Sequence, residues 1–158
     1  MSNYTRAEID AAFAQYCALR ERSSATGDWT IWGNQFTLDA HYVEHAYGEF
    51  HGRDAIVRWI TGVMAPFPHM TFPNDWVVID EARGWVVFQC QNRLEHPTDP
   101  SGAPFQFPSW SVLRYAGTNQ WSYEEDMYNP AEGNDVVRAW LRAGGTFVAP
   151  PQVAMAKV

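Results

Sequence analysis

The stretch 36–56, FTLDAHYVEHAYGEFHGRDAI, concentrates side chains that can transfer protons. It contains three of the chain's five histidines, together with several carboxylates and two tyrosines. Imidazole, carboxyl and phenol groups act as general acids and bases when burial or a neighbouring charge moves their pKa values toward neutrality. An ordinary hairpin does not need so many titratable groups. The stretch therefore predicts a site of acid–base chemistry.

The side chains of the expected strand 41–47 form two sets, because successive residues of a β-strand point to opposite faces. Tyr42 and Glu44 share one face, whereas His41 and His45 share the other. Only one set can line a cavity, and both are considered. A glutamate on a concave, aromatic-lined face loses solvation, so its pKa rises toward the range of a general base.

Two of these candidates also have purely structural interpretations. Glu44 can pair with Arg53 or Arg93 and only hold the hairpin together. His69, in the proline-rich segment 66–73, is either a proton carrier or an exposed loop residue. The sequence alone leaves both choices open.

A second group of carboxylates lies near the end of the last expected strand. Glu124 and Asp126 share a strand face with Tyr128, and Glu125 points the other way. If that face lines the cavity, Asp126 lies opposite Glu44, and two close carboxylates share one proton. Alternatively, the run is a solvated acidic patch, or Asp126 orients a catalytic histidine.

The elements that position these groups follow from hydrophobic spacing and turn residues. Helices are expected at about 5–24, 54–65 and 130–143, with a short one after Asp28 that reaches Phe36. Strands are expected at 41–47, 49–51, 76–80, 85–94, 105–115 and 121–128.

Helices followed by consecutive strands with short turns predict an α+β domain. We expect a curved antiparallel sheet of about six strands, packed on three N-terminal helices, with a further helix at the C-terminal end. Such a sheet leaves a hollow on its concave side, where the site should lie. The domain should span 1–145, and 146–158 should form a loose arm or dock on a partner subunit.

The composition excludes several classes of partner. The formal net charge is −7, with eleven Lys and Arg residues and no basic run, so nucleic acid and membrane surfaces are not expected partners. No run approaches the roughly 20 apolar residues that span a bilayer, and no signal peptide is apparent, which predicts a cytoplasmic protein. Cys17 and Cys90 are expected to be reduced thiols. The aromatic content of 15% suits a packed core or an apolar ligand cavity.

Short motifs spread over about residues 4–143 point to a known family. They are Gly27-Asp28-Trp29, Phe36-x-x-Asp39-Ala40, Gly52-Arg53-Asp54-Ala55-Ile56, Tyr115-Ala116-Gly117 and Trp121. Together they resemble the nuclear transport factor 2-like superfamily, specifically its SnoaL-like branch of polyketide cyclases and relatives. The resemblance implies a cone-shaped curved sheet around a pocket. The superfamily includes isomerases, dehydratases, cyclases, epoxide hydrolases and non-catalytic binding proteins.

The resemblance to the ketosteroid isomerases of this superfamily assigns roles to individual positions. Their base lies five residues beyond the Asp of the Asp-Ala pair, which is Glu44 here. Their oxyanion-hole acid falls on Ser111, so the base matches in type and the oxyanion hole does not. The far wall falls on Glu124, Asp126 and Tyr128, and the phenolic donor on Tyr16 or Arg20.

The resemblance to scytalone dehydratases is partial. Their catalytic histidine lies seven residues before a strand-opening tryptophan, as His69 does before Trp76. Their strand serine falls on Ser109, and the neighbouring Asn falls on Ser111. His45 takes the place of a strand tyrosine, and the Tyr-Asp pair at the end of the first helix is replaced by Ser24-Ala25.

These patterns predict a cofactor-independent enzyme that transfers protons on a small hydrophobic, ring-containing substrate, as an isomerase, a dehydratase or other lyase, or a cyclase. The alternatives are a non-catalytic module that binds a hydrophobic ligand in the same hollow and, ranked lower, an epoxide hydrolase that uses Arg93. We expect Glu44 as the base and His69 as a second proton carrier, with Asp126 and Tyr42 also catalytic. The expected substrate-binding residues are Tyr16, Arg20, Trp32, His45, Trp59, Ser109, Ser111, Glu124 and Tyr128.

No metal or cofactor is expected. The chain has no H-E-x-x-H motif and no Gly-rich phosphate loop. His41 and His45 could bind a metal together with Glu44 only if they shared its strand face, which alternation prevents. The aromatic-rich sheet and the family resemblance suggest a homodimer formed through the convex sheet faces.

Overall fold

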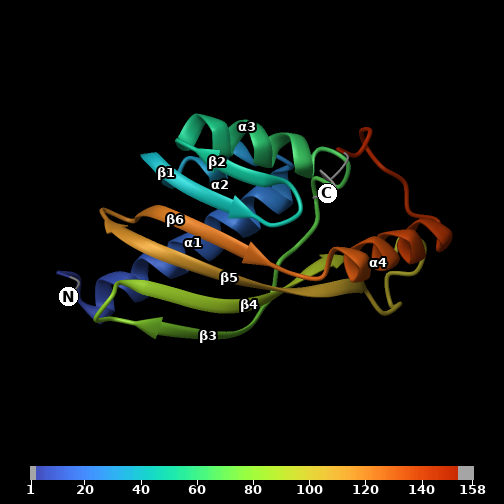
Figure 1. The fold of residues 1–158 in the computed structure, drawn as a ribbon. Coiled ribbons are helices and arrows are strands. Elements are labelled where there is room, and N and C mark those ends of the chain that lie inside the picture. Colours follow the sequence, from blue (N-terminus) through green and yellow to red (C-terminus); the bar gives the residue numbers. More distant parts are fainter. Residues whose placement is uncertain (1–2, 153–158) are drawn as a thin grey trace.

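A computed structural model describes residues 3–152, which form a curved sheet with helix α1 along one face (Figure 1). The helices are α1 (Arg6–Thr26), α2 (Thr30–Gly33), α3 (Arg53–Met64) and α4 (Pro130–Arg142). The strands are β1 (Phe36–Glu44), β2 (Gly48–His51), β3 (Asn74–Asp80), β4 (Trp85–Leu94), β5 (Phe105–Gly117) and β6 (Gln120–Met127). The expected α+β architecture is therefore confirmed.

The sheet has the strand order β2-β1-β6-β5-β4-β3. Strands β3 to β6 form the expected antiparallel meander, and β1 and β2 form an antiparallel hairpin. The pairing of β1 with β6 is parallel, so the sheet is mixed. This pairing brings the first and the last strand of the chain side by side. Between them the chain forms β2, α3 and the strands β3 to β5.

Helix α1 begins where the sequence predicts and ends two residues later than expected, at Thr26. Thr5 and Glu8 form a capping box, in which the Thr5 side chain accepts the Glu8 N–H and the Glu8 carboxylate accepts the Thr5 N–H. Gly27 ends the helix in the left-handed region, with φ of 77°. Ile9, Phe13 and other residues at helical spacing are buried against the sheet core.

Several expected boundaries are wrong. β1 starts at Phe36, which was assigned to the short helix, and it ends at Glu44 rather than continuing to Tyr47. Helix α3 is preceded by Gly52, with φ of 86°, and Asp54 lies in its first turn rather than at its cap. The turn between β1 and β2 spans 45–47. The backbone N–H groups of Ala46 and Tyr47 donate to the Glu44 side chain there, so these residues do not continue the strand.

The concave face of the sheet carries the core. Along β1, Ala40, Tyr42 and Glu44 are buried while the alternate residue His41 is partly exposed. The Tyr42 and Glu44 set therefore faces inward. Side chains also alternate along β5 and β6, so Ser109, Ser111 and Glu124 are buried on the same concave face.

The segment after α4 folds back toward α3. The Val148 N–H donates to the Pro66 carbonyl at 2.8 Å, and the Phe147 ring lies 6.1 Å from the Phe67 ring. Residues 146–152 were expected as a loose or partner-docking arm, but they contact their own domain; positions 153–158 lie outside the described residues. The domain boundary at 145 stays a prediction. No helix within 3–152 is long and apolar enough to cross a membrane.

Candidate functional site

A cavity of about 510 Å³ lies between the helices and the concave face of the sheet. Its walls are mainly aromatic and aliphatic, and α4 and the segment after it contribute part of the lining. Apolar residues of the wall include Trp29, Trp32, Trp59, Ile60, Phe67 and Phe107. A concave apolar site with a few polar groups suits a small hydrophobic ligand.

The polar part of the cavity wall contains two carboxylates on one face of β6. The Tyr16 hydroxyl donates to Glu124 Oε1 at 2.7 Å. The Tyr42 hydroxyl donates to Asp126 Oδ2, and the Ser111 hydroxyl donates to Asp126 Oδ1 at 2.5 Å. All five residues line the cavity; Tyr16 comes from α1, and the other four come from the inward faces of β1, β5 and β6.

The two carboxyl groups have different environments. Burial, followed by the charge of Asp126, raises the pKa of Glu124 well above its ordinary value, and its Oε2 atom has no hydrogen-bond partner among the described residues. Burial also raises the pKa of Asp126, but the hydrogen bonds from Ser111 and Tyr42 oppose that rise because they favour the ionised form. Burial therefore favours the protonated form of both groups, and the hydrogen bonds from Ser111 and Tyr42 favour the ionised form of Asp126.

Arg20 places a positive charge in the same wall. Its side chain is only 6% exposed, and its Nη2 atom donates to the Phe72 carbonyl at 2.8 Å and to Asn74 Oδ1 at 2.7 Å. The guanidinium lies 5.4 Å from the ring centroids of both Tyr16 and Phe88. These two hydrogen bonds go to neutral groups, and the positive charge of Arg20 opposes the rise that burial causes in the pKa values of Glu124 and Asp126.

Glu44 is buried beside the site but does not line the cavity. It lies opposite Asp126 in the β1–β6 pairing, as expected. Its Oε2 atom accepts the backbone N–H groups of Ala46 at 2.8 Å and Tyr47 at 2.6 Å. Burial raises its pKa, whereas a hydrogen bond from Tyr128 opposes the rise. Its visible role is to hold the turn after β1.

Neither arginine considered as a partner of Glu44 bonds to it. Arg53 Nε donates to the Phe36 carbonyl at 2.5 Å, and Arg93 Nε donates to Gln106 Oε1 at 2.7 Å. The observed partners of Glu44 are instead backbone amides of its own turn.

The two histidines in the expected site lie away from the cavity. His69 is exposed, and its Nδ1 atom donates to the Ser24 carbonyl at 2.7 Å beside the end of α1. His45 lies on the convex face of the sheet, where its Nε2 atom is 2.8 Å from Glu125 Oε1. Asp126 consequently orients neither ring. The spacing of His69 before Trp76 marks a loop position and does not bring the imidazole inward.

The other expected ligand contacts are largely present in the cavity wall. Ser109 and Tyr128 line it together with Trp32 and Trp59. The sequence analysis missed Cys90 and Asn92 of β4 and Gly133 and Asn134 of α4, among others. Alternation could have identified the β4 pair, because Phe88, Cys90 and Asn92 share a strand face. The α4 residues carried no such signal.

The comparisons identify the family. The SnoaL-like domain family matches residues 14–122, which is more than half of the chain. The chain therefore belongs to the SnoaL-like family, as its motifs suggested. No curated protein matches it significantly.

Solved structures share the fold at low sequence identity. A protein of ketosteroid isomerase-like fold from Catenulispora acidiphila, in complex with trimethylamine, is 23% identical over 79% of this chain and 88% of its own, with a TM-score of 0.56. An NTF2-like protein from Anabaena variabilis is 16% identical over 82% and 95%, with a TM-score of 0.62. TerC, co-crystallised with polyporic acid, is 14% identical over 83% and 98%, with a TM-score of 0.59.

We predict that Glu44 stabilises the hairpin turn. Glu44→Ala removes the acceptor of two backbone N–H groups and should lower the free energy of unfolding by about 2 kcal/mol. Glu44→Gln keeps an acceptor oxygen and should retain most of the stability. Urea denaturation of both variants measures the difference. Wild-type stability in Glu44→Ala would show that the turn does not depend on this side chain.

A second prediction concerns the pH dependence of stability. The raised pKa of Glu124 means that the wild type is fully stabilised below the ordinary value of 4.5 and loses stability as the pH rises through the folded-state pKa. Glu124→Gln cannot ionise, so it should exceed the wild type by on the order of 1 kcal/mol or more at pH 7. The difference should vanish near pH 4.

The matched control is the neighbouring Glu125→Gln on the convex face. Hydrogen bonds from Tyr123 and His45 lower the pKa of Glu125, so this variant should change stability in the opposite direction. Denaturant titrations at several pH values measure both. A pH-independent difference for Glu124→Gln would contradict the assignment of its proton.

Proposed function

We propose that this protein is an acid–base enzyme that transfers a proton on a small hydrophobic, ring-containing molecule held in the cavity. The observation that carries the proposal is the buried pair of Glu124 and Asp126 in the cavity wall, each of which accepts hydrogen bonds from neighbouring hydroxyl groups. We assign the proton to Glu124 and the negative charge to Asp126, because Asp126 accepts two such hydrogen bonds and Glu124 accepts one. An acid beside a base in an apolar cavity can perform isomerase, lyase or cyclase chemistry.

Asp126 is the proposed base. Its carboxylate takes a proton from a substrate carbon next to a carbonyl group, and the electron pair of that C–H bond forms a new C=C bond. Glu124 gives its proton to the carbonyl oxygen as the enol forms. In an isomerisation, Asp126 returns its proton to another carbon of the conjugated enol while the enol O–H proton goes back to Glu124. In an elimination, the leaving group departs from the neighbouring carbon with the electron pair of its bond and takes the proton from Asp126, and the enol O–H proton again goes back to Glu124. The charge of Arg20 favours the oxygen that becomes negative in the transition state.

These roles differ from the ones that the sequence suggested. Glu44 does not line the cavity, and its carboxylate accepts two backbone amide hydrogens, so we assign it to the turn rather than to proton abstraction. His69 lies in a separate groove, so the second proton carrier is Glu124 instead. Tyr42 was expected to be catalytic and Ser111 to bind the substrate; we propose instead that both orient the base Asp126.

The cavity suits a small, largely apolar substrate. Its wall offers several aromatic rings and the polar cluster around Glu124 and Asp126, which matches a substrate that has a flat apolar body and one or two oxygen atoms. Two proteins of the same fold were crystallised with small molecules, namely trimethylamine and polyporic acid. A non-catalytic module that binds such a ligand is the second candidate, because Tyr16, Tyr42 and Ser111 already satisfy three of the carboxylate oxygens.

The test uses a panel of steroids, polyketide aromatics, terpenoids and aryl ethers. Thermal shift identifies compounds that stabilise the wild type, and mass spectrometry and NMR report whether they are converted. We expect Asp126→Asn to lower turnover by about 10²- to 10⁴-fold while binding persists. Glu125→Gln, one residue away on the outer face, should leave turnover unchanged.

The outcomes separate the two candidates. Binding without conversion by the wild type would support the binding module and overturn the enzyme. Conversion that survives in Asp126→Asn but disappears in Glu44→Gln would return the role of base to Glu44.

We further propose that the convex sheet face pairs with a second copy of the chain. Trp76, Val78, Trp110 and Met127 are 38%, 59%, 50% and 42% exposed, and the rings of Trp76 and Trp110 are in contact at 5.5 Å. Such exposed apolar side chains mark an interaction surface.

A cytoplasmic location stays a proposal, consistent with Cys17 and Cys90 as free thiols.

Light scattering tests the dimer. The wild type should have twice the chain mass of 18.0 kDa, and Trp110→Lys should shift it toward the monomer because a charge would be buried at the interface. Arg114→Lys, on the same strand face, keeps its charge and should remain dimeric. A monomeric wild type would exclude this interface.

A further inference from the structure

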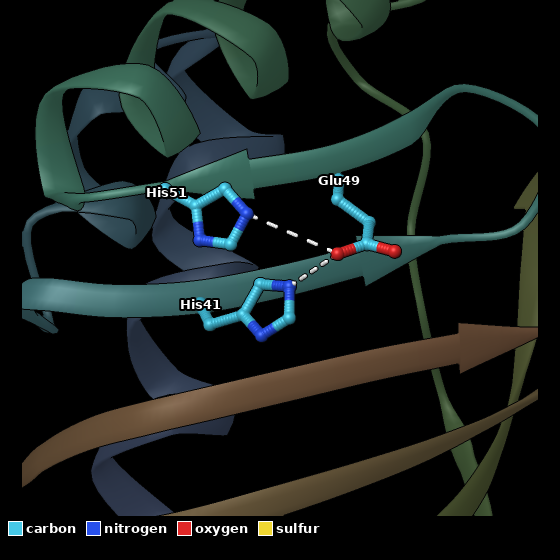
Figure 2. Close-up of side chains that lie close together, drawn as sticks. All are labelled: His41, Glu49 and His51. Carbon is cyan, nitrogen blue, oxygen red and sulfur yellow. Dashed lines mark hydrogen bonds and ion pairs between the residues drawn. The ribbon is translucent and has the colours of Figure 1, made fainter.

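A second group of titratable side chains lies on the convex face of the sheet, away from the cavity. His41 comes from β1, and Glu49 and His51 come from β2 (Figure 2). His41 and His51 are directly opposite each other in the hairpin register. Glu49 is two residues from His51 and so shares its strand face. The register of β1 and β2 therefore brings two imidazoles and one carboxylate together.

The three side chains converge on a small volume. Figure 2 shows both imidazoles directed at the same carboxylate oxygen, Glu49 Oε2. His41 Nε2 lies 2.9 Å and His51 Nε2 lies 3.9 Å from this atom. All three ligand atoms lie within 4.8 Å of one another, and the two rings are stacked at 4.3 Å with an interplanar angle of 15°.

These distances are close to those of a zinc site. Tetrahedral Zn²⁺ with bonds of about 2.0–2.1 Å holds its ligand atoms about 3.3 Å apart. Small side-chain rotations would bring the three atoms to that spacing. Tyr123 of β6 packs edge-on against His41 at 5.5 Å, which restricts the orientation of that ring.

We propose that His41, Glu49 and His51 bind a divalent transition-metal ion of the Zn²⁺ type. Two imidazole nitrogens and a carboxylate oxygen are ligands that Zn²⁺ prefers, whereas Mg²⁺ and Ca²⁺ prefer oxygen alone. The side chains of His51 and Glu49 are 72% and 58% exposed, so an ion would enter from solvent and keep a position for water.

The site is separate from the proposed acid–base chemistry. It occupies the face of β1 that points away from Tyr42 and Glu44. A bound ion would join β2, the edge strand, to β1 and so stabilise the hairpin whose inner face borders the cavity. The ion is therefore a structural element of the hairpin, and the proposal does not depend on the substrate.

The experiment is calorimetric titration of the untagged, chelator-treated protein with Zn²⁺. We expect saturable binding of one ion per chain and a higher Tm in its presence. His41→Ala, His51→Ala and Glu49→Gln should each weaken binding by about tenfold or more. Co²⁺ bound in place of Zn²⁺ should show the visible absorption of a tetrahedral complex.

His45→Ala is the matched control, because His45 lies on the same convex face, pairs with a glutamate and is not part of the cluster. It should bind Zn²⁺ as the wild type does. Circular dichroism establishes that each variant is folded. Absence of saturable binding by the wild type, or binding that survives in His41→Ala/His51→Ala, would overturn the proposal.

Discussion

The burial of two carboxyl groups side by side on β6 is the constraint on which the rest of the site depends. Removing a carboxylate from water is unfavourable unless hydrogen bonds or a positive charge compensate. The fold supplies this compensation from three different elements: Tyr16 and Arg20 of α1, Tyr42 of β1 and Ser111 of β5. The helix, the hairpin strand and the meander must therefore all be in place before the pair is stable. The same arrangement gives the two carboxyl groups unequal numbers of hydrogen-bond donors.

Glu44 shows how a residue of the expected type can be placed for a different purpose. It faces inward on the strand that the family resemblance indicates, and burial raises its pKa. Its lone pairs are nevertheless used by the amides of the following turn, and that local interaction also ends β1. A titratable group is available for chemistry only when its hydrogen-bonding capacity is not already taken by the backbone.

The sequence was sufficient for the features that depend on local pattern. Periodicity predicted α1, α4 and the strand Trp85–Leu94, and alternation placed Glu124 and Asp126 on one face. Features that depend on register could not be predicted. A turn centred on Gly48 would have placed His51 opposite His45, whereas the observed turn at 45–47 places it opposite His41. The position of His69 likewise depends on the path of a loop, which leaves no periodic signal.

The parallel contact between β1 and β6 has a consequence for how the chain reaches its native state. These strands are separated by about half of the sequence, so the contact requires closure of a long loop and raises the contact order. During synthesis, the hairpin β1–β2 emerges from the ribosome long before its partner, and one edge of β1 stays uncovered until β6 arrives. An uncovered edge is a template for wrong strand pairing. The charged and histidine side chains on the outer face of this hairpin would then disfavour aggregation of the nascent chain.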